Sequence, residues 1–138
     1  MGQVFVSFGV TNFSDVDPAA IVRRPPSETR MTALDEVLMD TGATHLCLPA
    51  DLVARLGLGL GYATPVETAT GTDVVRVFRN ALVTYEDRSA VVEVIEVPLG
   101  RPPLLGAIPM EALGIEPDLR NRRVRKLARD LNSSYIRI

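Results

Sequence analysis

The sequence predicts an all-β fold in a single domain of 138 residues. Val4, Val6 and Phe8 alternate with smaller or polar residues, which is the period of a half-buried strand. Residues 62–97 are rich in β-branched side chains and are interrupted by a turn sequence, Glu86-Asp87-Arg88. With 46% hydrophobic and 23% charged residues, the chain can bury one modest core.

The other segments are assigned from their local patterns. Residues 3–10 are predicted to form an edge or interface strand, and residues 12–26 an irregular connection that is rich in Asp and Pro. Residues 50–57 place apolar side chains on one side and end in Gly, which predicts a short helix. Residues 115–126 are expected to add a final strand, and 132–138 either a further short strand or a loose tail.

The segment Gly57-Leu58-Gly59-Leu60-Gly61 has the composition of a glycine-rich phosphate loop. It follows a predicted helix, however, and does not join a strand to a helix, so the geometry that cradles an anion is not expected. We therefore interpret it as an ordinary loop and disfavour nucleotide binding.

The overall charge gives no reason to expect a nucleic-acid or anionic-membrane partner. The formal net charge is -2 and the isoelectric point is near 5.4. Seven of the 15 basic residues lie in the last 19 positions, but Tyr135 is the one aromatic residue among them. This favours a solvated basic face. Contact with an acidic partner or nucleic acid is the weaker alternative.

Cysteine content and hydropathy suggest a cytoplasmic protein. Cys47 is the one cysteine, so an intrachain disulfide is impossible and an oxidising compartment is not required. Residues 1–10 lack the basic start and apolar centre of a signal peptide, and no apolar run is long enough to span a bilayer.

One stretch, residues 37–49, combines a buried strand pattern with a reactive side chain. Leu38 and Met39 are apolar, Asp40-Thr41-Gly42 is a turn former with a free carboxylate, and apolar character returns at Leu46. Asp-Thr-Gly by itself is also an ordinary turn sequence. The apolar flanks predict a carboxylate at the end of a hydrophobic strand.

Two further segments follow in a defined order. Ala69-Thr70-Gly71-Thr72 lies between β-patterned stretches, and Leu104-Leu105-Gly106 is followed by a short helical pattern. With Asp40-Thr41-Gly42-Ala43, these motifs resemble the single-domain, retropepsin-like (clan AA) aspartic peptidases over roughly residues 34–125. The resemblance implies a closed one-lobed barrel with one or two short helices, a core of about residues 30–126, and a basic tail or interface strand at 127–138.

The resemblance also implies a mechanism and a partner. Asp-Thr-Gly occurs once, whereas the family's chemistry needs two carboxylates, so Asp40 from each subunit of a homodimer would form the acid–base pair. Thr41, Gly42 and Ala43 would support the loop, residues 69–72 would form a flap over an extended peptide or unfolded protein substrate, and residues 104–106 would lie beneath the site. Neither a metal nor a cofactor is implied.

Two positions depart from the retroviral pattern. Retroviral members usually carry an Asp after Asp-Thr-Gly-Ala and an Arg after the downstream Gly, and the two form an ion pair. Here these positions hold Thr44 and Ala107. Since both partners are missing together, no orphan charge is expected, but dimer contacts must rest on other residues.

Other functions are weighed against the peptidase. His45 and Cys47 are too few ligands for a closed zinc site, and we expect His45 to pack beside the loop. The main alternative is a dimeric module of the same fold that binds an extended peptide or protein without cutting it. In that case Asp40 would serve loop structure only.

Overall fold

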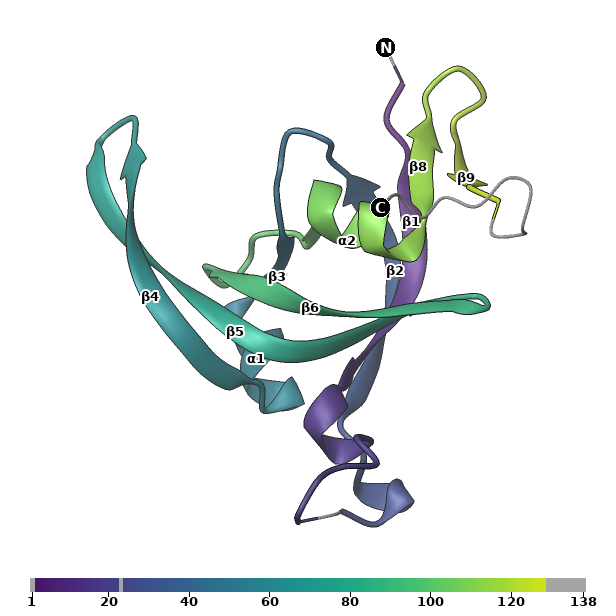
Figure 1. The fold of residues 1–138 in the computed structure, drawn as a ribbon. Helices are drawn as coiled ribbons and strands as arrows, with labels where there is room; N and C mark the ends of the chain where they lie inside the picture. Colours follow the sequence, from purple (N-terminus) through teal and green to yellow (C-terminus); the bar gives the residue numbers. More distant parts are fainter. Residues whose placement is uncertain (1, 23, 129–138) are drawn as a thin grey trace.

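The structure is a computed structural model that describes residues 2–22 and 24–128 (Figure 1). These residues form a mostly β chain with two short α-helices, which confirms the all-β prediction at this level. The strands and helices are β1 (Phe5–Asn12), β2 (Met31–Met39), β3 (Leu46–Pro49), α1 (Ala50–Leu56), β4 (Gly59–Thr68), β5 (Gly71–Tyr85), β6 (Arg88–Val97), β7 (Leu104–Leu105), α2 (Ala107–Leu113), β8 (Ile115–Asp118) and β9 (Arg123–Lys126).

Seven strands form one ring-like sheet in the order β1-β2-β7-β3-β6-β5-β4. An additional pairing between β1 and β5 closes the ring, so that β4 pairs with β5 alone. Parallel pairs join β2 to β7 and β3 to β6. The outer part of the β4–β5 hairpin projects from the ring, and we call it the arm (Figure 1).

Strand β1 corrects the expectation of an edge or interface strand at residues 3–10. It pairs with β2 on one side and β5 on the other. Val4, Val6, Phe8 and Val10 are all buried in the main hydrophobic cluster, so the core also extends further toward the N-terminus than residue 30. An edge strand and an interior strand with one buried face show the same alternation of apolar and polar residues. The sequence pattern therefore could not distinguish between them.

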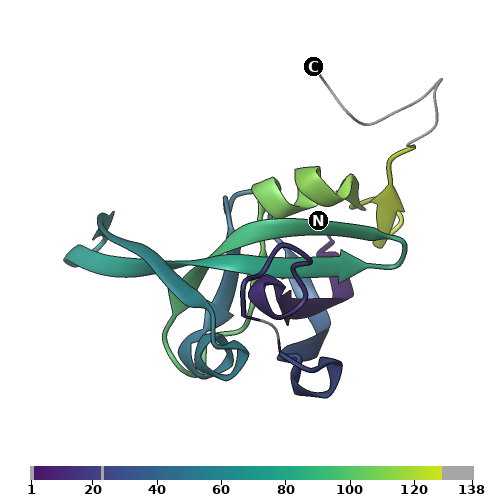
Figure 2. The ribbon, with the colours of Figure 1, turned by 60° about the horizontal axis from the view of Figure 1, so that its bottom comes forward.

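Both helices end where glycine takes a left-handed conformation. The predicted helix at 50–57 is confirmed as α1, which buries Leu52, Val53 and Leu56 and ends at Gly57 with φ 63°. Helix α2 ends at Gly114 with φ 67° and packs against β6 (Figure 2). Gly59 to Gly61, expected to lie in a loop, instead begin β4.

The C-terminal region contains a hairpin where a single final strand was expected. Strands β8 and β9 pair with each other in a separate two-stranded sheet. The buried Arg88 guanidinium donates to the carbonyls of Gly114 (2.6 Å) and Leu127, which ties this hairpin to the β5–β6 turn. The turn predicted at Glu86-Asp87-Arg88 is confirmed at Glu86 and Asp87, whereas Arg88 already begins β6.

The predicted strand or tail at 132–138, and the basic tail at 127–138 except for Leu127 and Ala128, lie outside the described residues. No helix among the described residues has the length and apolar character needed to cross a membrane.

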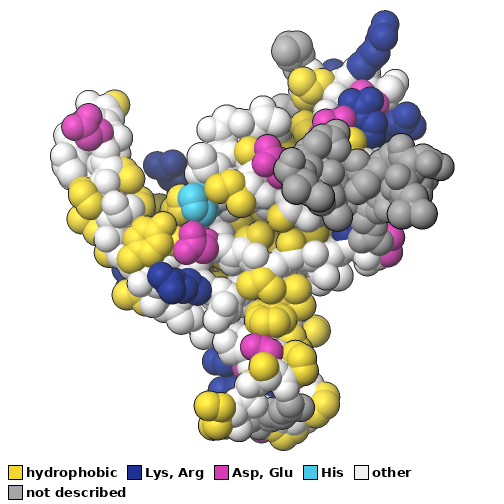
Figure 3. All heavy atoms as spheres, viewed as in Figure 1, with side chains coloured by type: hydrophobic (Ala, Val, Ile, Leu, Met, Phe, Trp, Pro, Cys, Tyr) yellow, Lys and Arg dark blue, Asp and Glu magenta, His cyan; other side chains and the backbone are white. Residues whose placement is uncertain are grey.

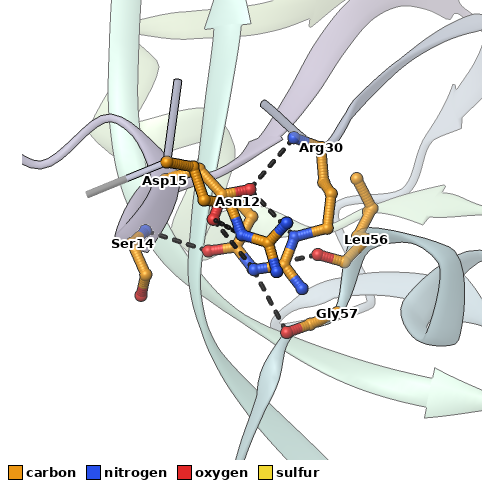
Figure 4. A network of polar contacts seen from close by, with 7 residues as sticks. Asn12, Ser14, Asp15, Arg30, Leu56 and Gly57 are labelled. Carbon is orange, nitrogen blue, oxygen red and sulfur yellow. Dashed lines mark hydrogen bonds and ion pairs between the residues drawn. The ribbon is translucent and has the colours of Figure 1, made fainter. Parts of the chain in front are cut away.

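A polar network joins Asn12 to the end of α1 and Asp15 to Arg30 (Figure 4). The Asn12 side-chain amide donates to the carbonyls of Leu56 (2.9 Å) and Gly57 (3.1 Å). Arg30 donates two side-chain hydrogen bonds to Asp15, at 2.9 and 2.8 Å. The Asp15 side chain is only 3% exposed, and its pKa is lowered to about 2, chiefly by the hydrogen bond from Arg30.

Candidate functional site

Asp40 directly follows β2, and its backbone holds its side chain in place. Val37 and Met39 point into the core, so by strand alternation Leu38 and Asp40 share the opposite face of the sheet, which we call the site face. The Asp40 amide donates to the Leu105 carbonyl at 2.9 Å. The Gly42 amide donates to Asp40 Oδ1 at 2.9 Å, so the turn itself orients the carboxylate.

The loop of residues 40–45, which we call the Asp40 loop, is fastened to the chain that follows β7. Gly106 donates to the His45 carbonyl (3.0 Å), Ala107 to that of Ala43 (2.8 Å) and Ile108 to that of Thr44 (2.9 Å). Leu105, whose carbonyl accepts from the Asp40 amide, and Gly106 therefore lie against the Asp40 loop, whereas Leu104 pairs with Leu38 and Cys47. Thr41 and Gly42 are exposed.

Position 106 requires a glycine because the neighbouring backbone leaves no room for a Cβ. A Cβ at this position would lie 2.5 Å from the His45 carbonyl oxygen and 2.7 Å from that of Ala43. The backbone of Gly106 has φ -89°, which any residue can adopt. Close approach of two backbone segments, and not conformation, therefore explains the glycine.

Residues 69–72 lie at the tip of the arm and are all exposed. Thr68 Oγ1 donates to the Gly71 carbonyl at 2.8 Å, and Gly71 takes φ 134°, a conformation that side-chain-bearing residues rarely adopt. The arm tip stands apart from the Asp40 loop, with open space between the two (Figures 1 and 3). In this structure the tip is therefore not in contact with Asp40.

An apolar row crosses the site face, with one residue from each strand of the sheet. Pairing brings Leu38 beside Leu104, Leu104 beside Cys47, Cys47 beside Ile95, and Ile95 beside Val77. Phe5 and Tyr62 extend the row at its two ends. Asp40 lies two residues beyond Leu38, so the carboxylate borders an apolar surface.

Cys47 occupies the middle of this row. Burial raises the pKa of the Cys47 thiol, and the Asp40 carboxylate raises it further. The thiol therefore stays protonated at neutral pH and contributes to the row as a small apolar group.

His45 borders the same face beside two polar neighbours. Its Nδ1 lies 2.7 Å from Thr44 Oγ1, and its Nε2 lies 3.8 Å from Glu93 Oε1. Sequence reasoning assigned His45 to packing beside the loop and missed Glu93. The pairing of β3 with β6 brings them together, and no sequence signal indicated that register.

A cavity of about 290 Å³ borders the Asp40 loop. Asp40 and Thr41 contribute to its wall together with the N-terminal segment 2–4 and Leu119, which lies between β8 and β9. The Asp40 loop therefore adjoins both the N-terminal segment and the C-terminal hairpin.

Within residues 2–22 and 24–128, no three His, Cys, Asp or Glu side chains are arranged to hold a metal ion. Basic residues of the C-terminal hairpin face acidic partners: Arg123 with Asp118 (3.6 Å), Arg125 with Glu116 (2.8 Å) and Lys126 with Glu86 (2.7 Å). These pairs reduce the free positive charge that a polyanion would need.

The sequence matches no known family model and no curated protein.

Proposed function

We propose that this chain is one subunit of a homodimeric aspartic endopeptidase in which Asp40 of each copy supplies half of the catalytic pair. The observation that carries the proposal is the Asp40 turn. A carboxylate fixed by its own backbone adjoins an apolar row, on a loop whose tip, Thr41 and Gly42, is exposed. The sequence resemblance to retropepsin-like peptidases supports the same assignment.

The proposed chemistry is general acid–base activation of water. Two carboxylates brought close together cannot both ionise easily, so one keeps a proton while the other is charged. The charged Asp40 would take a proton from a water molecule as that water attacks the peptide carbonyl. The protonated Asp40 would donate to the carbonyl oxygen, so no covalent intermediate forms.

The surrounding residues have defined roles in this proposal. Gly42 holds the Asp40 carboxylate through its amide, and the exposed Thr41 would contact the partner's loop. The arm tip would close over an extended peptide, bound partly through main-chain hydrogen bonds. The apolar row would receive a side chain of that peptide.

Asp40→Asn tests the assignment directly. The change keeps the volume of the side chain and removes the ionisable proton, so cleavage of an unfolded protein should fall by about 10²- to 10⁴-fold while the fold is kept. Asp35→Asn, an exposed change on β2, the strand that precedes Asp40, is the matched control and should cleave normally. Normal cleavage by Asp40→Asn would refute the catalytic role.

Two further measurements separate the peptidase from a peptide-binding module. Cleavage per chain should fall on dilution to concentrations where sedimentation shows monomers, because each copy carries half of the pair. A statine-type inhibitor, which imitates the hydrated peptide, should bind wild type tightly and Asp40→Asn weakly. Equal peptide binding by both proteins, with no cleavage by wild type, would favour the binding module.

A further inference from the structure

Beside the apolar row, the site face carries a second, polar row of residues. It includes a carboxylate, Glu93, that sequence analysis did not single out. Leu104 pairs with Leu38 in a parallel pair and with Cys47 in an antiparallel pair. Two residues after Leu38 and Leu104, and two residues before Cys47, Asp40, Gly106 and His45 therefore fall on one line. Cys47 pairs with Ile95, and the same step places Glu93 next to His45 on that line. The 3.8 Å distance from His45 Nε2 to Glu93 Oε1 agrees with this register.

Glu93 approaches His45 at a distance too long for a hydrogen bond. The His45 ring is oriented by Thr44, whose hydroxyl lies 2.7 Å from Nδ1. The 3.8 Å gap on the other side of the ring is longer than a hydrogen bond, and 42% of the Glu93 side chain is exposed. Among the described residues, no other cation lies within ion-pair distance of Glu93.

Glu96, three residues further along β6, differs from Glu93 because it has an arginine partner. Arg76 donates two side-chain hydrogen bonds to it, at 2.9 and 2.8 Å, and its side chain is 15% exposed. Glu93 therefore differs from its neighbour in having free acceptor capacity on the face that carries Asp40. Figure 3 shows histidine and acidic side chains at the surface beside the hollow between the arm and the body of the molecule.

We propose that Glu93, with His45 as its positioning residue, forms a subsite that selects a Lys or Arg side chain of the bound peptide. The proposal rests on the proposed function, because it requires an extended peptide along the site face. A peptide with an apolar side chain on the row of Leu104, Cys47 and Ile95 would bring a nearby side chain to the polar row. There a cation meets the Glu93 carboxylate.

The test measures binding, so it does not depend on turnover. Fluorescein-labelled peptides with a central Leu-Val pair, in which the flanking Gln residues are replaced by Lys one at a time, are titrated into Asp40→Asn. At one position Lys should improve affinity by about two- to fivefold over Gln, and the gain should shrink as salt is added.

Two variants locate the effect. Glu93→Gln in the Asp40→Asn background should abolish the Lys preference, whereas Glu111→Gln, an exposed change on α2, should keep it. A Lys preference that survives in Glu93→Gln, or equal affinity of Lys and Gln peptides for the parent protein, would overturn the subsite. The salt dependence in the parent protein decides the question should Glu93→Gln fold poorly.

The outcomes distinguish this proposal from the peptidase assignment. A Glu93-dependent Lys preference without cleavage by wild type would leave the subsite standing and reject the peptidase. Cleavage by wild type with no Lys preference at any position would reject the subsite alone. Absence of binding by every peptide would reject the subsite together with the peptide-binding groove.

Discussion

Gly106→Ala should damage both the fold and the site, because the added methyl group meets backbone on three sides. The new Cβ would lie 2.5 Å from the His45 carbonyl oxygen, 2.7 Å from that of Ala43 and 2.7 Å from the His45 nitrogen. None of these atoms belongs to a flexible side chain. The Asp40 loop itself must therefore move away from β7.

The size of the effect follows from these distances. Ordinary contact begins at 3.4 Å, so the loop must withdraw by about 0.9 Å at its tightest point. Three hydrogen bonds cross this gap, from Gly106, Ala107 and Ile108, and each contributes about 1 kcal/mol. Together with overpacking strain, we expect the free energy of unfolding to fall by about 3 kcal/mol.

Urea unfolding of wild type, Gly106→Ala and Gly59→Ala measures this loss. Gly59 is the matched control, since a Cβ there meets nothing within 4 Å, and its change should stay within about 0.5 kcal/mol of wild type. Cleavage by Gly106→Ala should fall by about 10²-fold, because a shift of this size misplaces Asp40. A Gly106→Ala protein as stable as the Gly59→Ala control would refute the reasoning.

Two other changes give contrasting outcomes. Under the proposed function, Gly71→Val should reduce turnover far more than stability, because Val is strained at the Gly71 φ of 134° and would distort the tip that closes over the peptide, whereas a Cβ there meets nothing within 4 Å. Kinetics and urea unfolding of one preparation check this. Asp15 should make the free energy of unfolding depend on pH, because its native pKa of about 2 lies below the ordinary 3.8. The stabilisation that Asp15 gives the folded state is complete above pH 3.8 and is lost as the pH falls to about 2. The loss should be about 2 kcal/mol at most, since the partner arginines are partly screened by solvent. Asp15→Asn should flatten unfolding free energy over this range, and an unchanged slope would contradict the assignment.

Local signals in the sequence were sufficient for several elements. The apolar positions and terminal Gly57 defined α1, and Glu86-Asp87 defined the β5–β6 turn. Asp40 directly follows a strand, as its flanks predicted, but only Val37 and Met39 of that strand are buried. Each of these features depends on neighbours within a few residues, where periodicity and turn chemistry apply.

These local signals could not predict the contacts between segments that are far apart in the sequence. The position of β1 between β2 and β5 depends on ring closure, and its alternation would be the same at an edge. The hydrogen bond from Asn12 to Leu56 spans 44 residues, and the meeting of His45 with Glu93 depends on a parallel register. Neither strand carries a residue that specifies its partner, so only the folded chain reveals these neighbours.

The structure shows what the Thr44 side chain contacts at the position where retroviral members carry an Asp. Retroviral members place a charged pair at the positions of Thr44 and Ala107, whereas here Ala107 joins the Asp40 loop through its amide alone. The Thr44 hydroxyl turns instead to His45, which faces Glu93 across 3.8 Å. A carboxylate beside the Asp40 loop is thus present after all, but it comes from β6 and is half exposed. Under the proposed function, Glu93, which lies 3.8 Å from His45 and has no arginine partner among the described residues, would act on the peptide bound along the site face.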